Sequence, residues 1–337
     1  MVLILLVSIS IISALLSRLV PRWDGLLAWL LGMLLAICAG LYTEGFDHEQ
    51  YVLMIENTIL LTDQDILVQL YAAKDPLFLL IIKLTVAFTD NIQLVFLIVA
   101  TLASLTKVLA TSAIKGRRTL FMALYVIFIS PGLEFAAIRA GLAVGLTMLG
   151  YFAVQRLPWK ILWVVLGVLS HISLLIITAG RIWVSRWYTM LIGTVFIIPP
   201  IILFLPSLIE EDDRYSQYLA NGGNLLAFAL PVVTLLCMLL LILSIKSKQT
   251  VQHSALTQNW LLTSFFILGS VFVLTIPVVT VATRLMEIGW VLLLFQIVAR
   301  DSQVNKKSAV VRVFLLAAMI SLLSVANLLR GTWAILI

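Results

Sequence analysis

The sequence predicts an all-α polytopic membrane protein, and three observations support this fold class. The chain of 337 residues is 62% hydrophobic and 11% charged, with a mean hydropathy of +1.14. An ordinary soluble domain is about 45–50% apolar and about 25% charged, and it cannot bury so much apolar surface. Apolar stretches of membrane-crossing length also recur along the chain. These features exclude a soluble enzyme, a disordered protein and a disulfide scaffold.

The apolar stretches predict about 11–12 transmembrane helices, at roughly 20 residues for each crossing. Some of these helices are expected to be broken or re-entrant, because 76–89 is short, 119–133 is marginal and 188–206 carries Pro199-Pro200. The prediction is a single integral membrane domain over residues 1–337. The stretches lie at 2–20, 25–42, 76–89, 91–114, 119–133, 137–155, 160–179, 188–206, 225–245, 257–277, 280–299 and 309–329.

Charge predicts which loops face the cytoplasm, because cytoplasmic loops collect Lys and Arg. Arg18 and Arg22 after the first stretch indicate an inside loop and an outside N-terminus. Most acidic residues fall in segments 43–75 and 207–224, which are therefore predicted to be external loops. The net charge of +6 is explained by these flanking bases and is no signal of nucleic-acid binding.

Two topologies remain open between the acidic segments. If every stretch crosses the membrane, the loop at 115–118 lies outside and Arg139 faces inside. If 76–89 and 188–206 do not cross fully, the loops at 115–118 and 156–160 lie inside and Arg139 faces outside. The positions of the bases favour the second topology.

The long external segment 43–75 alternates acidic and apolar residues, which is typical of short amphipathic helices at a membrane interface. Pro76 is suited to the first turn of the next helix, and Asp75 lies favourably at the positive end of that helix.

Ionisable residues within apolar stretches are costly and mark candidate functional sites. Arg139 lies off a stripe of small residues, Ala137, Gly141 and Gly145, that permits close helix packing. Its guanidinium can clamp a phosphate with two parallel hydrogen bonds. The alternative is an interfacial anchor that pairs with Glu134.

His171 is expected inside the 160–179 helix, either as a hydrogen-bond donor to a diphosphate, as a proton shuttle, or as a neutral helix-to-helix contact. Arg284 with Glu287 forms either a self-neutralising i,i+3 pair or a second phosphate-binding group. Lys83 and Lys107 are interpreted as lysines that extend to the interface.

In the acidic segment, Asp47 and Tyr51 share a face if the chain is helical there, and Glu44 joins them. A carboxylate beside a membrane cavity can act as a general base on a sugar hydroxyl. Tyr215 and Tyr218 can stack on sugar rings or lie in the interfacial aromatic belt. No motif for a cofactor, a metal site or ATP hydrolysis is present, so none is predicted.

Short motifs in a fixed order resemble the EpsG family of Wzy-type polysaccharide polymerases across about residues 42–295. The chain departs from the family pattern at Asp75, where Glu is usual, at Ala140, where Gln is common, and at Ile172 between His171 and Ser173. The motifs are Phe46-Asp47 with Tyr51, Asp75-Pro76-Leu77-Phe78, Ile138-Arg139 with Ala143, His171-Ile172-Ser173, Tyr215 with Tyr218, and Thr283-Arg284.

The resemblance implies an enzyme of the wider GT-C glycosyltransferase class at the outer face of the bacterial cytoplasmic membrane. It implies oligosaccharide units carried on undecaprenyl diphosphate as substrates, with membrane lipid and a possible chain-length regulator protein as partners. In that class an acidic residue of the first large external loop is catalytic, which here would be Asp47. A flippase of lipid-linked sugars, or a membrane acyltransferase with His171 as base, is the alternative.

Overall fold

The computed structural model describes residues 2–44, 47–60, 75–171, 174, 287–292, 294–295 and 298–299. All regular structure within these residues is helical, as the sequence predicts. The helices are α1 (Val2–Leu19), η1 (Pro21–Trp23), α2 (Asp24–Leu41), α3 (His48–Leu60), α5 (Pro76–Val86), α6 (Ile92–Ala110), η2 (Thr111–Ile114), α7 (Arg118–Phe128), α8 (Ser130–Leu133), α9 (Ile138–Met148), η3 (Leu149–Ala153) and α10 (Leu157–Ser170).

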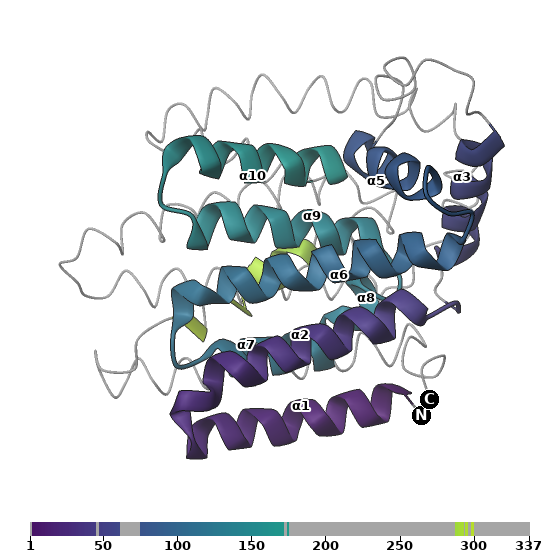
Figure 1. The fold of residues 1–337 in the computed structure, drawn as a ribbon. Coiled ribbons are helices and arrows are strands. Elements are labelled where there is room, and N and C mark those ends of the chain that lie inside the picture. Colours follow the sequence, from purple (N-terminus) through teal and green to yellow (C-terminus); the bar gives the residue numbers. More distant parts are fainter. Residues whose placement is uncertain are drawn as a thin grey trace, which may run out of the picture. The chain divides into compact units, whose positions relative to one another are not determined.

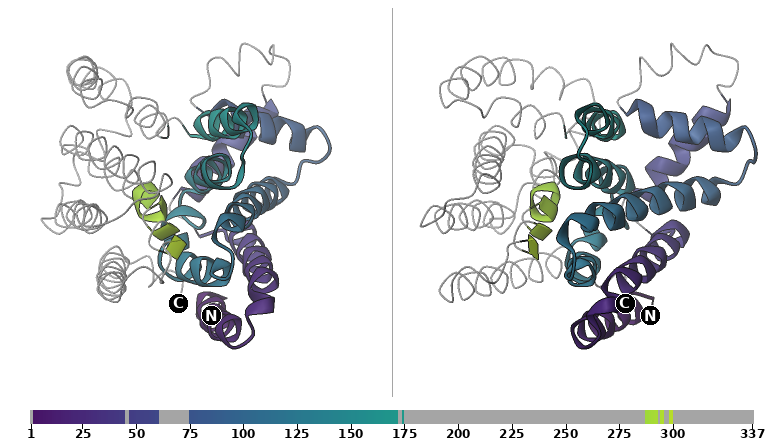
Figure 2. Two further views of the ribbon diagram at one scale, coloured as in Figure 1. Left: turned by 90° about the vertical axis from the view of Figure 1, so that its left-hand side faces the viewer. Right: turned by 60° about the vertical axis from the view of Figure 1, so that its left-hand side comes forward.

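Helices α1 to α10 belong to one compact unit, which also includes residues 294–295 and 298–299, whereas 287–292 belong to a second unit. Within the first unit, α1, α2, α6, α9 and α10 lie side by side in that order (Figure 1). Helix α7 packs against α1 and α2, and α5 packs against α3, α6 and α10. Figure 2 shows the same unit from two further sides.

Local sequence explains where several helices begin. Asp75 occupies the N-cap position of α5 and Pro76 its first turn, as predicted. The Asn91 side chain caps α6 by accepting a 3.0 Å hydrogen bond from the Gln93 backbone N–H. Pro158 lies in the first turn of α10, where its missing N–H costs nothing.

Small residues let the central helices approach closely, as the glycine stripe in α9 predicts. A Cβ on Gly145 would lie 2.2 Å from Thr106 Oγ1 and 2.9 Å from the Ala103 carbonyl oxygen of α6. A Cβ on Gly167 of α10 would lie 2.3 Å from Thr147 Oγ1 of α9. The α6–α9–α10 packing therefore depends on residues without side chains.

We expect Gly145→Ala to destabilise the protein by about 1–3 kcal/mol, because α6 must move away from α9 to admit the methyl group. The measurement is thermal unfolding in detergent. Gly25→Ala in α2 is the matched control, since its Cβ would meet only the flexible end of Arg118 at 3.4 Å. Equal unfolding temperatures for the two variants would contradict the packing argument.

The two ends of this unit differ in charge. The α1–α2 and α6–α7 connections lie together at one end, where the Asp24 carboxylate accepts hydrogen bonds from the backbone N–H groups of Arg118 (3.1 Å) and Thr119 (3.0 Å). The η3–α10 connection adjoins them, since η2 packs against η3. Bases gather at this end, namely Arg18, Arg22, Lys115, Arg117, Arg118, Arg156 and Lys160. The opposite end carries Glu44, Asp47, Glu49, Asp75 and Asp90.

The stretch from residue 42 to residue 91 begins and ends at the acidic end. The Gln93 side chain at the start of α6 donates a hydrogen bond to the Gly40 carbonyl near the end of α2. Helix α5, with 11 residues, is about 16 Å long, far short of a bilayer core of about 30 Å. The topology in which 76–89 crosses fully does not fit this arrangement. The loops at 115–118 and 156–160 lie with Arg18 and Arg22, as the second topology requires. The 188–206 stretch lies outside the described residues.

Two helical segments, Pro21–Leu41 and Ile92–Ile114, are long and apolar enough to cross a membrane, and shorter apolar helices accompany them. Large apolar side chains are also exposed along the outer faces of α1, α2 and α10, among them Leu5, Leu15, Leu26, Met33, Ile161 and Val165. Contiguous exposed apolar surface is unusual in a soluble protein. Together these features indicate a membrane protein.

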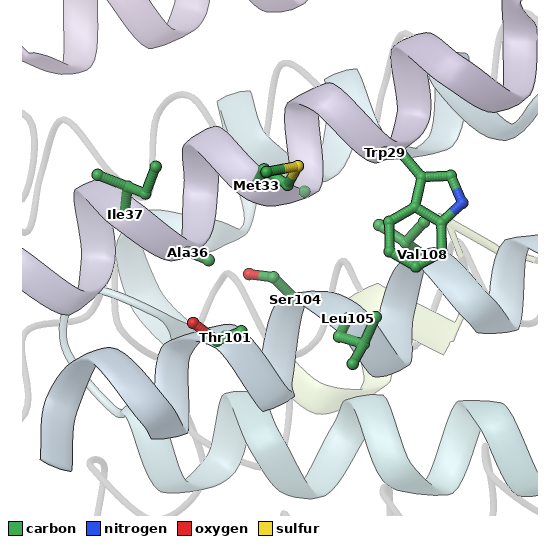
Figure 3. A pocket seen from close by; sticks show the side chains of 9 residues that line it. Trp29, Met33, Ala36, Ile37, Thr101, Ser104, Leu105 and Val108 are labelled. Carbon is green, nitrogen blue, oxygen red and sulfur yellow. The ribbon is translucent and has the colours of Figure 1, made fainter. Parts of the chain in front are cut away.

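A shallow apolar hollow of about 170 Å³ lies between α2 and α6 (Figure 3). Trp29 and Met33 of α2 and Leu105 and Val108 of α6 contribute to its walls. Ser104 Oγ beneath it has no hydrogen-bond partner among the described residues. This hollow contains no charged side chain, and the candidate site lies elsewhere in the unit.

Candidate functional site

An ion pair between Arg139 and Asp75 forms the centre of the candidate site. Arg139 lies in the first turn of α9, and its Nη1 donates to Oδ2 of Asp75 at the N-cap of α5. The Asp75 side chain is 4% exposed, whereas the Arg139 side chain is 25% exposed. The carboxylate is therefore a buried support, and the Arg139 side chain is partly accessible to a ligand.

His171 completes this polar centre from a third helix. Its Nδ1 lies 3.5 Å from Asp75 Oδ1, the carboxylate oxygen that Arg139 does not use. The His171 side chain is 22% exposed. The buried carboxylate thus lies between two partly accessible groups, one of which is always charged and one of which can exchange a proton.

Helix α3 supplies an aromatic and acidic wall beside Arg139. The guanidinium carbon lies 4.9 Å from the centre of the Tyr51 ring and 5.7 Å from that of Phe78 in α5. Asp47, Tyr51 and Asp75 all act electrostatically on Arg139. Cation–π attraction at these distances helps to hold the guanidinium in place.

Helix α3 has a buried and an exposed face, as predicted for this part of segment 43–75. The Tyr51 backbone N–H donates to the Asp47 carbonyl (3.1 Å), so the two residues lie one helical turn apart, as expected. Tyr51 and Ile55 are buried, whereas Glu49, Leu53 and Glu56 are exposed. At the start of α3, His48 stacks on Phe96 at 4.6 Å, and burial lowers the pKa of its imidazole while Glu49 opposes that shift.

The structure gathers four of the residues singled out in the sequence, namely Asp47, Tyr51, Arg139 and His171, around Asp75. Glu44 lies at the same end in the exposed chain after α2. Glu287 belongs to the second unit. The remaining candidates, Arg284, Tyr215 and Tyr218, lie outside the described residues.

Two local expectations are wrong. Helix α10 ends at Ser170 instead of continuing to 179, and His171 has extended backbone with φ −162° and ψ 113°. The alternative in which Arg139 pairs with Glu134 is also wrong, because Arg139 pairs with Asp75 and Glu134 pairs with Lys107. The two carboxylates face different neighbours, α9 for Asp75 and α6 for Glu134.

The role of Asp75 was not predicted from the sequence, which suggested only a helix-terminus function for it. Its carboxylate makes no capping hydrogen bond to α5 and turns instead to Arg139. The Asp-Pro pair that begins α5 was a visible signal, since Pro76 fixes the helix start and thereby the position of the residue before it.

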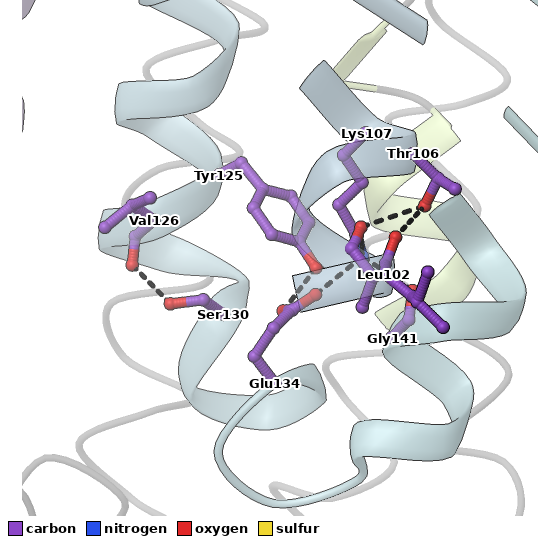
Figure 4. A network of polar contacts seen from close by, with 9 residues as sticks. Leu102, Thr106, Lys107, Tyr125, Val126, Ser130, Glu134 and Gly141 are labelled. Atoms are coloured by element: carbon purple, nitrogen blue, oxygen red, sulfur yellow. Dashed lines mark hydrogen bonds and ion pairs between the residues drawn. The ribbon is translucent and has the colours of Figure 1, made fainter. Parts of the chain in front are cut away.

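A second polar cluster, formed by Lys107, Tyr125 and Glu134, is fully enclosed among α6, α7, α8 and α9 (Figure 4). Lys107 Nζ lies 2.6 Å from Glu134 Oε1 and donates to the carbonyl oxygens of Gly141 (2.6 Å) and Ala103 (3.1 Å). The Tyr125 hydroxyl donates to Glu134 Oε2. Both charged side chains are 0% exposed, so the interpretation of Lys107 as an interfacial lysine is wrong.

This buried cluster fixes the entry to α9. A Cβ at Gly141 would lie 2.9 Å from Glu134 Oε1, so the glycine makes room for the carboxylate. Gly141 follows Arg139 by two residues on the same helical turn. The cluster is closed to ligands, and its position makes it a structural support for the turn that carries Arg139.

The candidate site can therefore hold an anionic group on Arg139 and exchange a proton through His171 or a nearby carboxylate. Among the described residues, no three His, Cys, Asp or Glu side chains lie close enough together to hold a metal ion.

Comparison with known proteins gives one match. The model of the EpsG family matches residues 26–333. No curated protein and no solved structure matches the chain.

Proposed function

The chain belongs to the EpsG family, whose members are Wzy-type polysaccharide polymerases, and we propose that it joins undecaprenyl-diphosphate-linked oligosaccharide units into a surface polysaccharide. The observation that carries this proposal is the partly exposed Arg139, held by the buried Asp75 beside His171 at the acidic end of the helices. A fixed guanidinium is well suited to a diphosphate because its geometry matches two phosphate oxygens.

In the proposed reaction the growing chain is the donor. A hydroxyl oxygen of the next repeat unit attacks the anomeric carbon of the donor sugar, and the bond from that carbon to the diphosphate breaks. Undecaprenyl diphosphate leaves with the bonding electron pair, and the acceptor hydroxyl loses its proton to a base. Atoms and charge balance without a cofactor or an external reductant.

Each candidate residue has a role in this reaction. Arg139, with Arg284, offsets the charge that develops on the leaving diphosphate, which is catalysis by preorganised electrostatics. Asp47 takes the proton of the acceptor hydroxyl, and His171 donates a hydrogen bond to the diphosphate or passes on the proton. Tyr51 forms part of the wall, and Glu44, Tyr215, Tyr218 and Glu287 are the remaining substrate-binding candidates.

The charge difference between the two ends supports an outward-facing site. Bases mark the cytoplasmic side of membrane helices, so the end with Arg18, Arg22 and the 115–118 connection would face the cytoplasm. Arg139 and Asp75 would then face the outside of the bacterial cytoplasmic membrane, in a multi-pass chain of GT-C type. A chain-length regulator is a further expected partner.

A flippase would use the same arginine to bind the diphosphate during transport, and it is the alternative function. A membrane acyltransferase with His171 as base is the third. We place both behind the polymerase because the family match points to polymer formation.

The test is the surface polysaccharide profile of a deletion strain that carries wild-type protein or Arg139→Ala at matched protein level. We expect wild type to restore a ladder of long chains, and the variant to leave single repeat units on their anchor. If the deletion strain retains lipid-linked units inside the cell and displays none at the surface, the protein is a flippase and not a polymerase. A full ladder of long chains with Arg139→Ala would show that Arg139 is not part of the site.

A further inference from the structure

We propose that Asp75 is the positioning residue of the site, because it orients the His171 imidazole while it holds Arg139. This inference rests on the proposed function, since it names how that site is set up for its chemistry. Asp75 reaches both groups because each of its carboxylate oxygens faces a different partner. Oδ2 accepts from Arg139 Nη1, and Oδ1 lies 3.5 Å from His171 Nδ1.

The three residues come from the ends of three helices, and the fold fixes each end separately. Pro76 sets the start of α5 directly after Asp75. Arg139 lies in the first turn of α9, which the enclosed Lys107–Glu134 pair supports through the Gly141 carbonyl. His171 follows the last residue of α10, and its backbone N–H still donates a 3.2 Å hydrogen bond to the Gly167 carbonyl in that helix.

Burial makes Asp75 a support instead of a reacting group. It is 4% exposed, while its two partners are 25% and 22% exposed. A buried carboxylate needs compensation for its lost hydration, and Arg139 supplies a permanent positive charge. The carboxylate thus has one oxygen paired with Arg139, and its other oxygen can accept a hydrogen bond from a second neighbour.

The consequence for His171 is a defined tautomer. With Nδ1 facing a carboxylate, the neutral ring carries its hydrogen on Nδ1, which fixes the tautomer of the imidazole. The distance of 3.5 Å is longer than a hydrogen bond, and such contacts commonly tighten only when substrate is bound. Asp47, just before α3, and Tyr51 in its first turn act electrostatically on Arg139 in the same centre.

The first measurement is ¹⁵N NMR of histidine-labelled protein in bilayers, which is practicable because the chain has three histidines. The His171 signal is identified by its loss in His171→Gln. We expect the Nδ1–H tautomer in wild type and a shift toward the Nε2–H tautomer in Asp75→Asn. An unchanged His171 signal in a folded Asp75→Asn protein would overturn the proposal.

The second measurement is polymer formation with purified protein and lipid-linked repeat units. Asp75→Asn is expected to lower kcat by up to about 10²–10⁴-fold, because a misoriented His171 loses a proton transfer that is typically worth this much, with a smaller change in KM. Asp75→Glu keeps the charge and should restore part of kcat. Equal kcat values for wild type and Asp75→Asn would contradict the positioning role.

Two control variants separate this inference from the proposed function. Arg139→Lys leaves the Asp75–His171 contact in place, so the tautomer should remain as in wild type. Asp90→Asn removes an exposed carboxylate in the connection between α5 and α6 and should alter neither readout. If Arg139→Lys and His171→Gln lose activity while Asp75→Asn retains it, the proposed site is supported but the positioning role of Asp75 is wrong. If all three retain activity, the proposed site itself is wrong.

Discussion

Arg139→Lys is expected to abolish most polymer formation although it conserves the positive charge. A lysine ammonium lacks the planar fork that binds two phosphate oxygens at once. It also lacks the planar group that lies 4.9 Å from the centre of the Tyr51 ring in Arg139. Loss of one preorganised donor typically costs about 10²–10³-fold in kcat. The measurement is the rate of polymer formation by purified variant and wild type at equal protein concentration.

Arg156→Lys is the matched control for this substitution. Arg156 is exposed at the basic end, just before α10, at the opposite end of that helix from His171. It should retain the wild-type rate, and both variants should unfold at the wild-type temperature. If Arg139→Lys makes polymer at nearly the wild-type rate, Arg139 does not hold the diphosphate by two-point binding.

The enclosed Lys107–Glu134 pair should show a marked difference between single and double substitutions. Removal of one partner leaves a buried charge without compensation, which typically costs about 3–5 kcal/mol. We therefore expect Lys107→Met and Glu134→Gln each to be strongly destabilised. The double variant should recover much of that loss, because no charge remains buried. Denaturant titration of the four proteins in detergent gives the coupling free energy between the two residues.

Lys83→Met in α5 is the control for the loss of a lysine from an apolar helix. Lys83 is partly exposed, so its substitution should change the free energy of unfolding by no more than about 0.5 kcal/mol. Additive effects of Lys107→Met and Glu134→Gln would show that the two side chains act independently. That result would contradict the proposed support of the first turn of α9 by the Lys107–Glu134 pair.

Hydropathy was sufficient to predict the longest helices. The expected stretches at 2–20, 25–42 and 91–114 correspond to α1, α2 and α6 within a few residues, because a long apolar run has few alternatives to a helix. The end of α10 at Ser170 was not predicted. A hydropathy average changes little when one histidine interrupts an apolar run, so it cannot locate a local break in the backbone.

The pairing of charges was beyond the sequence for a different reason. Arg139 and Asp75 are 64 residues apart, and Lys107 pairs with Glu134 although the whole of α7 lies between them in the sequence. The sequence offers several acidic residues as partners for each basic residue, and only the three-dimensional packing selects among them. The small residues around Lys107, namely Ala103, Thr106 and Ala110, line a buried face of α6. Their helical spacing was the one signal that this lysine faces inward.

The excursion between α2 and α6 has an evolutionary consequence. It begins at the acidic end at residue 42 and returns to the same end by residue 91. The direction of α6 and of the helices after it therefore does not depend on this segment. Such a segment can be lengthened, shortened or exchanged without inverting anything that follows it. Helix α5 and Asp75 belong to this segment, whereas Arg139 and the enclosed Lys107–Glu134 pair belong to the helices outside it. A change in the length of the excursion therefore alters the α5 side of the site, while the helix that carries Arg139 keeps its orientation.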